Sequence, residues 1–134
     1  MRGDTTLLHR ELTDKIIGAF YDVHNALGYG FLETVYQRAM QVALDDADID
    51  CKTEVSFPVA FRGREVGNYR ADLVVEKNVI VETKTAQAIT AVHEMQLINY
   101  LKASRVQVGL VLNFGPKPTF QRYVLSSHPR RPVR

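Results

Sequence analysis

The chain has 134 residues, of which 46% are hydrophobic and 24% are charged. This composition is typical of a globular domain, and it excludes a disordered chain, a collagen and a disulfide-stabilised scaffold. The length suits one domain, because a second domain would be too short for a core of its own. We place this domain at residues 1–127 and expect the Pro- and Arg-rich residues 128–134 to be a flexible basic tail.

The formal net charge of +2 depends on three arginines near the C-terminus, Arg130, Arg131 and Arg134. Without them the 17 basic residues fall to 14, against 15 acidic residues, so the rest of the chain is nearly neutral. A nucleic-acid-binding protein of this composition has no broadly basic surface. Its affinity has to come from local lysines and arginines, from the tail or from a metal ion.

The sequence also indicates in which compartment of the cell the protein is expected. Its single cysteine, Cys51, cannot form a disulfide within the chain, and the first residues lack the apolar region of a secretory signal. We therefore expect a cytoplasmic protein. No uncharged stretch approaches the roughly 18 to 20 apolar residues that a membrane span requires, so we expect no membrane insertion.

Two helices are predicted in the first third of the chain. Apolar residues recur at helical spacing over residues 12–27, where Thr13 or a neighbour can cap the start and Gly28 can end the helix. A second helical pattern covers about residues 31–45.

The apolar period then changes to two, which indicates β-structure. Three strands are predicted, at residues 52–61, 66–75 and 80–85. A turn at residues 77–79 joins the second strand to the third, so the three form a β-meander. Pro58 suggests that the first strand lies at an edge of the sheet, because proline cannot donate a ladder hydrogen bond.

The remaining elements complete the predicted order α-α-β-β-β-α-β-β. They are a helix at residues 88–103, a buried strand at 106–114 and a last strand at about 120–125.

Charged residues interrupt the two middle strands, which should otherwise be apolar. Glu82 and Lys84 are two residues apart, so they share one face of their strand. Asp72 joins them only if the turn has an odd number of residues or the strand contains a bulge. With a three-residue turn at 77–79, Val74 would face Glu82 and Asp72 would face Lys84.

Two carboxylates and an ammonium group on a partly buried sheet are costly unless they pair or bind a cation. In the functional interpretation, Asp72, Glu82 and the carbonyl of Thr83 bind Mg²⁺, and Lys84 lies beside the metal-bound water. The alternative is a structural cross-strand ion pair, which is the commoner meaning of an isolated Glu-x-Lys tripeptide.

Further blocks accompany this charged core. The motif Gly30-Phe-Leu-Glu33-Thr-Val-Tyr36 precedes it, and His93, Gln96, Tyr100 and residues 112–115 follow it. In this order the blocks resemble the PD-(D/E)XK nuclease superfamily and, more narrowly, the family of small proteins named for a GxxExxY motif. The resemblance covers about residues 12–123.

Two positions depart from the superfamily pattern. Ala71 precedes Asp72 where the nominal motif has proline, and Thr83 stands where an apolar residue is usual. We expect the Thr83 side chain to point away from the site and to affect packing alone.

The resemblance implies an α/β (α+β) fold with a restriction-endonuclease-like core, in which helices flank a mixed β-sheet. It also implies a phosphodiesterase that hydrolyses nucleic acid, with DNA as the expected substrate, by a metal-activated water. Mg²⁺ is the expected cofactor, with Mn²⁺ able to substitute. Asp72, Glu82 and Lys84 would be the catalytic residues.

Glu33 lies on the helical stripe that includes Tyr36, Met40 and Leu44, where a carboxylate needs a partner. It is either a third acidic group near the metal or a helix N-terminal glutamate favoured by the helix dipole. We expect Tyr36 to pack rather than react.

His93, Gln96 and Tyr100 follow one another at helical spacing, and we expect them at the centre of the sheet-facing side of their helix. The pair Gln96 and Tyr100 resembles a motif of RecB-type members of the superfamily, which implies a role in orienting phosphate or water. His93 is expected to contact phosphate or a leaving group. Alternatively, each side chain satisfies a buried hydrogen bond.

Two other classes of function stay open. One is a non-catalytic nucleic-acid-binding or protein-interaction module that retains the fold, and the other is a hydrolase of a different phosphate ester. Because so small a core has little surface for selecting substrates, a homodimer or a partner protein is also expected.

Overall fold

The computed structural model describes residues 8–125, which form three helices and five strands in the predicted order. The helices are α1 (Arg10–Leu27), α2 (Glu33–Asp46) and α3 (Ala91–Ser104), and the strands are β1 (Cys51–Phe61), β2 (Arg64–Val75), β3 (Val79–Lys84), β4 (Val108–Asn113) and β5 (Thr119–Val124). The predicted α/β (α+β) class with a mixed sheet is confirmed. The predicted basic tail, 128–134, lies outside the described residues.

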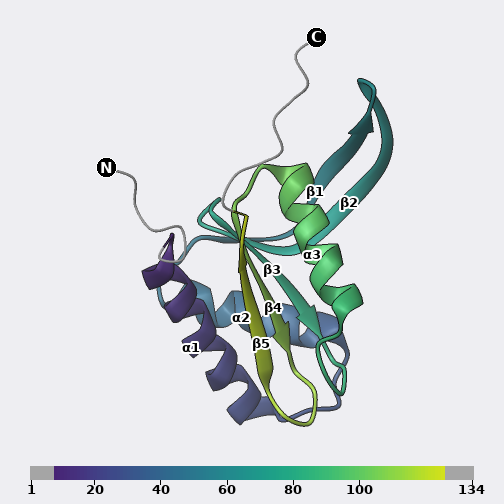
Figure 1. The fold of residues 1–134 in the computed structure, drawn as a ribbon. Helices are drawn as coiled ribbons and strands as arrows, with labels where there is room; N and C mark the ends of the chain where they lie inside the picture. The colour runs from purple at the N-terminus through teal and green to yellow at the C-terminus, as the bar shows by residue number, and fades with distance from the viewer. Residues whose placement is uncertain (1–7, 126–134) are drawn as a thin grey trace.

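The five strands form one sheet in the spatial order β1-β2-β3-β4-β5. Strands β3 and β4 are parallel, and every other neighbouring pair is antiparallel. Helix α3 makes the crossover between β3 and β4 and covers one face of the sheet, whereas α1 and α2 cover the other (Figure 1). Pro58 lies on β1, an edge strand, as predicted.

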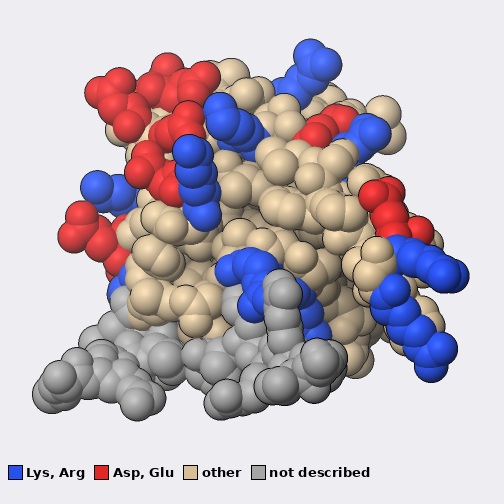
Figure 2. Space-filling model, turned by 90° about the horizontal axis from the view of Figure 1, so that it is seen from above, with Lys and Arg blue, Asp and Glu red and all other residues tan. Residues whose placement is uncertain are grey.

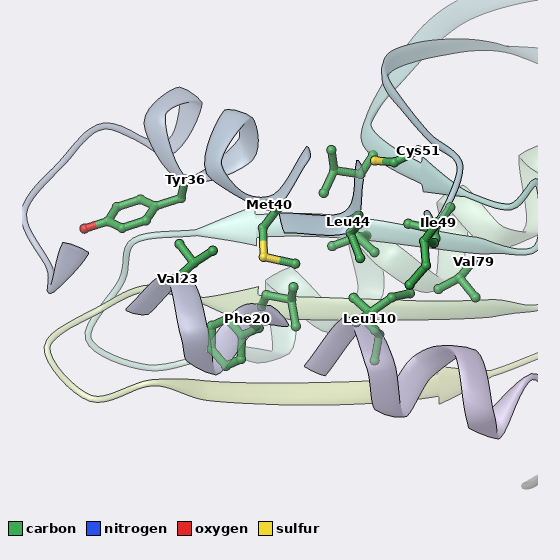
Figure 3. Close-up of a cluster of buried hydrophobic side chains, with 14 of the residues drawn as sticks. Phe20, Val23, Tyr36, Met40, Leu44, Ile49, Cys51, Val79 and Leu110 are labelled. Carbon is green, nitrogen blue, oxygen red and sulfur yellow. The ribbon is translucent and has the colours of Figure 1, made fainter. Parts of the chain in front are cut away.

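The larger core lies between the sheet and the helices α1 and α2. Figure 3 shows Phe20 and Val23 of α1, Met40 and Leu44 of α2, and Leu110 of β4 meeting in this layer. All of them except Val23 have no exposed surface. Because each fully buried side chain of this kind contributes about 1.5–3 kcal/mol, this layer accounts for much of the stability of the fold.

The layer under α3 is smaller. Leu97 and Leu101 are its fully buried helical residues, and they pack on Ile80 and Val111 of the sheet. Gly109 of β4 leaves room for Leu97, because a Cβ atom there would lie 2.8 Å from Leu97 Cδ1.

Several predicted boundaries were wrong at helix starts. Thr13 does not cap α1, which begins at Arg10; its hydroxyl instead donates to the Arg10 carbonyl from within the helix. Helix α2 begins two residues later than predicted. Helix α3 begins at Ala91 instead of residue 88, because the Thr90 hydroxyl caps it by accepting from the His93 N–H.

None of the helices within residues 8–125 is long and apolar enough to cross a membrane.

Candidate active site

Strands β2 and β3 form a fork, and Asp72 lies at its branch point. The two strands pair over three residues of β2, ending at Leu73, while β2 stays paired with β1 as far as Arg64. Beyond Asp72 the β1–β2 arm therefore rises away from β3 (Figure 1). The fork exposes the edge of β3 next to Glu82, where a regular hairpin would cover it.

The backbone is irregular at the branch point. Glu54, the β1 residue opposite Asp72 in this register, takes no part in the ladder and has a φ of +52°. Leu73 of β2 belongs to the core under α1 and α2, whereas Tyr69 and Ala71 belong to the core under α3. Since alternate residues of a regular strand stay on one face, β2 twists across the sheet at Asp72.

The predicted pairing of β2 with β3 was wrong by two residues. Val74 pairs with Ile80 and not with Glu82, and the turn is residues 76–78. The turn still has three residues, so the parity of the pairing is unchanged. The Asp72 side chain consequently still reaches β3.

Reciprocal hydrogen bonds join the two carboxyl-bearing residues. The Asp72 N–H donates to Glu82 Oε2 over 3.1 Å, and Asp72 Oδ2 accepts from the N–H and the hydroxyl of Thr83 over 2.8 and 2.9 Å. The expectation that the Thr83 side chain points away from the site was therefore wrong, because its hydroxyl fixes Asp72. Within residues 8–125, Asp72 Oδ1 and Glu82 Oε1 accept no hydrogen bond.

The surroundings of Glu82 disfavour its charged form. The side chain is 7% exposed, and burial, followed by the charge of Asp72, raises its pKa to about 8. The Asp72 N–H and the charge of Lys84 act in the opposite direction, and the charge of Glu33 raises the pKa further. No ion pair of Asp72 or Glu82 is found in the described part of the chain.

A divalent cation of the magnesium type fits these donors. The carbonyl of Thr83 faces the fork as well, because the N–H and C=O of one strand residue point to the same side. Two carboxylates and one carbonyl suit Mg²⁺, which keeps several waters. Within the described residues no group of three or more His, Cys, Asp or Glu could hold a metal ion, so the fit depends on the two carboxylates and the carbonyl.

Lys84 of β3 and Glu33 of α2 are the other charged residues whose charges act on Glu82. Lys84 is the half-buried last residue of β3, and its carbonyl accepts the Phe114 N–H over 2.7 Å. Glu33 is the exposed first residue of α2, although Tyr36 and Met40 on the same stripe are fully buried. The ends of β3 and β4 and the starts of α2 and α3 meet at the lower end of the sheet in Figure 1.

Residues 113–115 hold the segment that follows Lys84. The side-chain amide of Asn113 accepts from the N–H of Ala86 and donates to its carbonyl, each over 2.9 Å. A Cβ atom at Gly115 would lie 2.0 Å from the Ala86 carbonyl oxygen, so this close approach requires glycine. His24 of α1 contacts the Gly115 carbonyl from the other side.

The prediction that His93, Gln96 and Tyr100 lie at the centre of the sheet-facing side of α3 was wrong. Leu97 and Leu101 lie there, and Gln96 is exposed. The Nδ1 atom of His93 accepts from the Thr90 N–H over 3.1 Å and completes the helix cap. This hydrogen bond is exposed, so it is not the buried hydrogen bond considered as the alternative, and the contact of His93 with phosphate stays a prediction.

Tyr100 does reach the site, together with Tyr69, which the sequence analysis did not identify. Their rings stack with centroids 3.5 Å apart, and the charges of Glu82 and Asp72 help burial to raise the pKa of both hydroxyls. The Tyr69 hydroxyl is buried and has no hydrogen-bond partner within residues 8–125. In the sequence, Tyr69 is one aromatic residue of a strand pattern, so nothing distinguished it from a core residue.

Among residues 8–125, basic side chains form no continuous patch on the face shown in Figure 2. Lysines and arginines lie there singly or in small groups, and the largest gathering of acidic side chains is at the upper left. Binding of nucleic acid to this face would therefore depend on local groups, as the charge count predicts.

The fold and the fork define a restriction-endonuclease-like protein. Residues 10–123 match the PD-(D/E)XK nuclease superfamily, and the chain belongs to this superfamily. This is a superfamily of nucleases, which typically use divalent metal ions.

Other comparisons bear on the fold alone. No curated protein matches the sequence. Among solved structures, the crystal structure of SSO0001 is similar to this chain, with a TM-score of 0.53 and 20% sequence identity. The similarity covers 95% of this chain and 62% of SSO0001, so the chain spans less than two thirds of that protein.

Proposed function

We propose that this protein is a Mg²⁺-dependent nuclease that hydrolyses phosphodiester bonds of DNA with an activated water. The observation that carries the proposal is the fork: two carboxylates converge there, one has a pKa raised to about 8, and neither has a cationic partner within residues 8–125. Within the superfamily we assign the chain to the GxxExxY group, on Gly30, Glu33 and Tyr36.

Each residue of the fork has a separate task in this proposal. Asp72, Glu82 and the Thr83 carbonyl hold the ion, and the Thr83 hydroxyl keeps Asp72 in position. When bound, Mg²⁺ makes a water more acidic and offsets negative charge on the phosphate. Lys84 orients the attacking water and stabilises the charge that develops on the phosphate oxygens.

Four further residues complete the proposed site. Glu33 adds a third carboxylate that orients a water, since its charge is felt at Glu82. Gln96 and Tyr100 orient phosphate or water from α3. A contact between His93 and phosphate is compatible with the cap, because only the Nδ1 atom of the ring accepts from Thr90.

Cleavage of a supercoiled plasmid, with a matched RNA substrate, tests the proposal. We expect nicking of DNA with Mg²⁺ or Mn²⁺ and none with EDTA. Asp72→Asn should reduce the rate at least about a hundredfold, because it weakens the hold on the ion. Asp22→Asn is the matched control, since Asp22 is an exposed carboxylate of α1, and it should cleave at the wild-type rate.

An Asp72→Asn protein that nicks DNA as fast as wild type would contradict the proposal. If neither protein cleaves, calorimetric titration with Mg²⁺ tests whether the protein is a non-catalytic module. Binding of nucleic acid without metal binding at Asp72 and Glu82 would identify a non-catalytic module. The homodimer or partner protein and the cytoplasmic location remain predictions from the sequence.

A further inference from the structure

A pocket of about 320 Å³ lies beside the proposed active site. One wall is the α1–α2 connection with Tyr29 and Phe31, and the opposite wall is the segment after β3 with Thr85 and Gln87. Both walls continue directly into the site, because Thr85 follows Lys84 and Phe31 lies two residues before Glu33. The pocket therefore adjoins residues of the proposed active site along the chain on both sides.

The aromatic wall is held in place by the backbone and by Tyr36. The Tyr36 hydroxyl donates to the Gly28 carbonyl over 2.7 Å and accepts from the Phe31 N–H over 3.3 Å. Gly28 and Gly30 have φ values of +70° and +110°, which favour glycine. Tyr29 is nonetheless 64% exposed and Phe31 49% exposed, so this held backbone presents two aromatic side chains to solvent.

The residues that line the pocket favour a ligand that is uncharged and flat. None of the nine residues that line the pocket is charged, so a phosphate has no ionic partner within it. Aromatic rings offer stacking surfaces, and the side chains of Thr85 and Gln87 offer hydrogen-bond donors and acceptors across from them. A stacking face combined with polar edge contacts is the way proteins bind unpaired nucleobases.

We propose that this pocket is a subsite for one nucleobase of the strand that is cleaved. The inference rests on the proposed nuclease function and extends it to a substrate class. A base can enter only after it leaves the helical stack, so the substrate carries an unpaired nucleotide next to the scissile phosphate. Single strands and frayed ends meet this condition, whereas intact duplex DNA does so only after a base is flipped out.

The test is binding in EDTA, so that no cleavage intervenes. The probes are a fluorescein-labelled oligothymidylate and an abasic strand of equal length, compared by fluorescence anisotropy. Wild type should bind the thymidine strand more tightly by about 5- to 150-fold, the range expected for one stacked base. Tyr29→Ala should reduce this preference at least about fivefold, whereas Tyr29→Phe, which keeps the ring, should retain it.

The matched control is Phe61→Ala at the far end of β1. Phe61 is 60% exposed, close to the 64% of Tyr29, and it does not line the pocket. This variant should keep the wild-type preference. Equal affinity of wild type for both strands, or a preference that Tyr29→Ala leaves unchanged, would overturn the subsite.

The two proposals fail separately. Asp72→Asn should lose cleavage in Mg²⁺ and keep the preference for the base-containing strand. If wild type cleaves DNA but the preference does not depend on Tyr29, the subsite is wrong and the nuclease proposal stands. If the preference depends on Tyr29 but wild type with Mg²⁺ cleaves neither nucleic acid, the nuclease proposal fails and the pocket remains a base-binding site.

Discussion

The face of the sheet under α1 and α2 buries mainly apolar side chains, whereas the face under α3 carries ionisable groups at one end. Val79, Val81 and Leu110 have no exposed surface on the first face. On the second face Ile80 is equally buried, but Glu82 and Lys84 follow it along β3. Strand β3 thus contributes apolar side chains to the core on one side and ionisable side chains on the other.

The difference follows from where β2 leaves the sheet. A strand paired along its full length has its backbone groups satisfied by its neighbours, which leaves no opening for ligands. Because β2 turns away at Asp72, the N–H of Thr83 bonds to a carboxylate instead of to a neighbouring strand. In the proposed function this fork is where a cation would bind, whereas the face under α1 and α2 holds the larger core.

The largest expected effect comes from Lys84→Met. This change removes the positive charge closest in sequence to Glu82 and should slow DNA cleavage about 100- to 1,000-fold, the usual loss when a charge-stabilising group is removed. Stability in urea should change by less than about 1 kcal/mol, since Lys84 makes no ion pair within the described residues. Lys52→Met, on the exposed side of β1, is the control and should leave cleavage unchanged.

On the apolar face we expect the opposite, a large loss of stability with no change in the rate of cleavage. Leu110→Ala should lower the free energy of unfolding by about 2–5 kcal/mol, because it leaves a cavity in the layer shown in Figure 3. Cleavage by the protein that stays folded should continue at the wild-type rate. Val92→Ala at an exposed position of α3 is the control and should change stability by less than about 0.5 kcal/mol, and a comparable loss there would mean that burial does not cause the effect of Leu110→Ala.

Glu82→Gln should change how stability depends on pH. Since the pKa of Glu82 is raised from 4.5 to about 8, its contribution to stability is full below pH 4.5 and is lost as the pH rises toward 8. In EDTA, wild type should lose about 1–2 kcal/mol between pH 6 and pH 8 that the glutamine variant does not lose. Urea unfolding at both pH values measures this, and parallel curves for the two proteins would show that Glu82 titrates normally.

The smallest effect is expected for Tyr36→Phe. The ring still stacks on Phe114, but the hydroxyl that binds the Gly28 carbonyl and the Phe31 N–H is lost. We expect a loss of about 0.5–1.5 kcal/mol in unfolding free energy, together with faster amide hydrogen exchange at residues 28–32. Unchanged exchange there would mean that the glycines alone hold the connection.

The element order could be predicted from the sequence because apolar periodicity records it directly. The stripe of α1, the alternation in β1 and Pro58 at the sheet edge are local signals. The fork could not be predicted. A two-residue shift of register leaves the same side chains on the same face, so the pattern of faces in the sequence does not show where the pairing of β2 with β3 ends. The hydroxyl bond from Thr83 to Asp72 depends on that fork, so it was missed as well.

The orientation of α3 was wrong for a different reason. Val92 and Met95 are exposed, although Leu97 and Leu101 are buried, so apolar residues lie on more than one side of this helix. Its sequence therefore does not show which side faces the sheet. Asp72, Glu82 and Lys84 were identified because charge inside a strand is unusual, whereas Tyr69 and the pocket beside Tyr29 carry no such signal.

A manganese-soaked crystal would test the fork as a cation site most directly. The account predicts an anomalous density peak coordinated by Asp72 Oδ1, a carboxylate oxygen of Glu82 and the Thr83 carbonyl, and no such peak in Asp72→Asn. Density found only at the acidic side chains at the upper left of Figure 2, with Lys84 paired to Glu82 at the fork, would contradict the account.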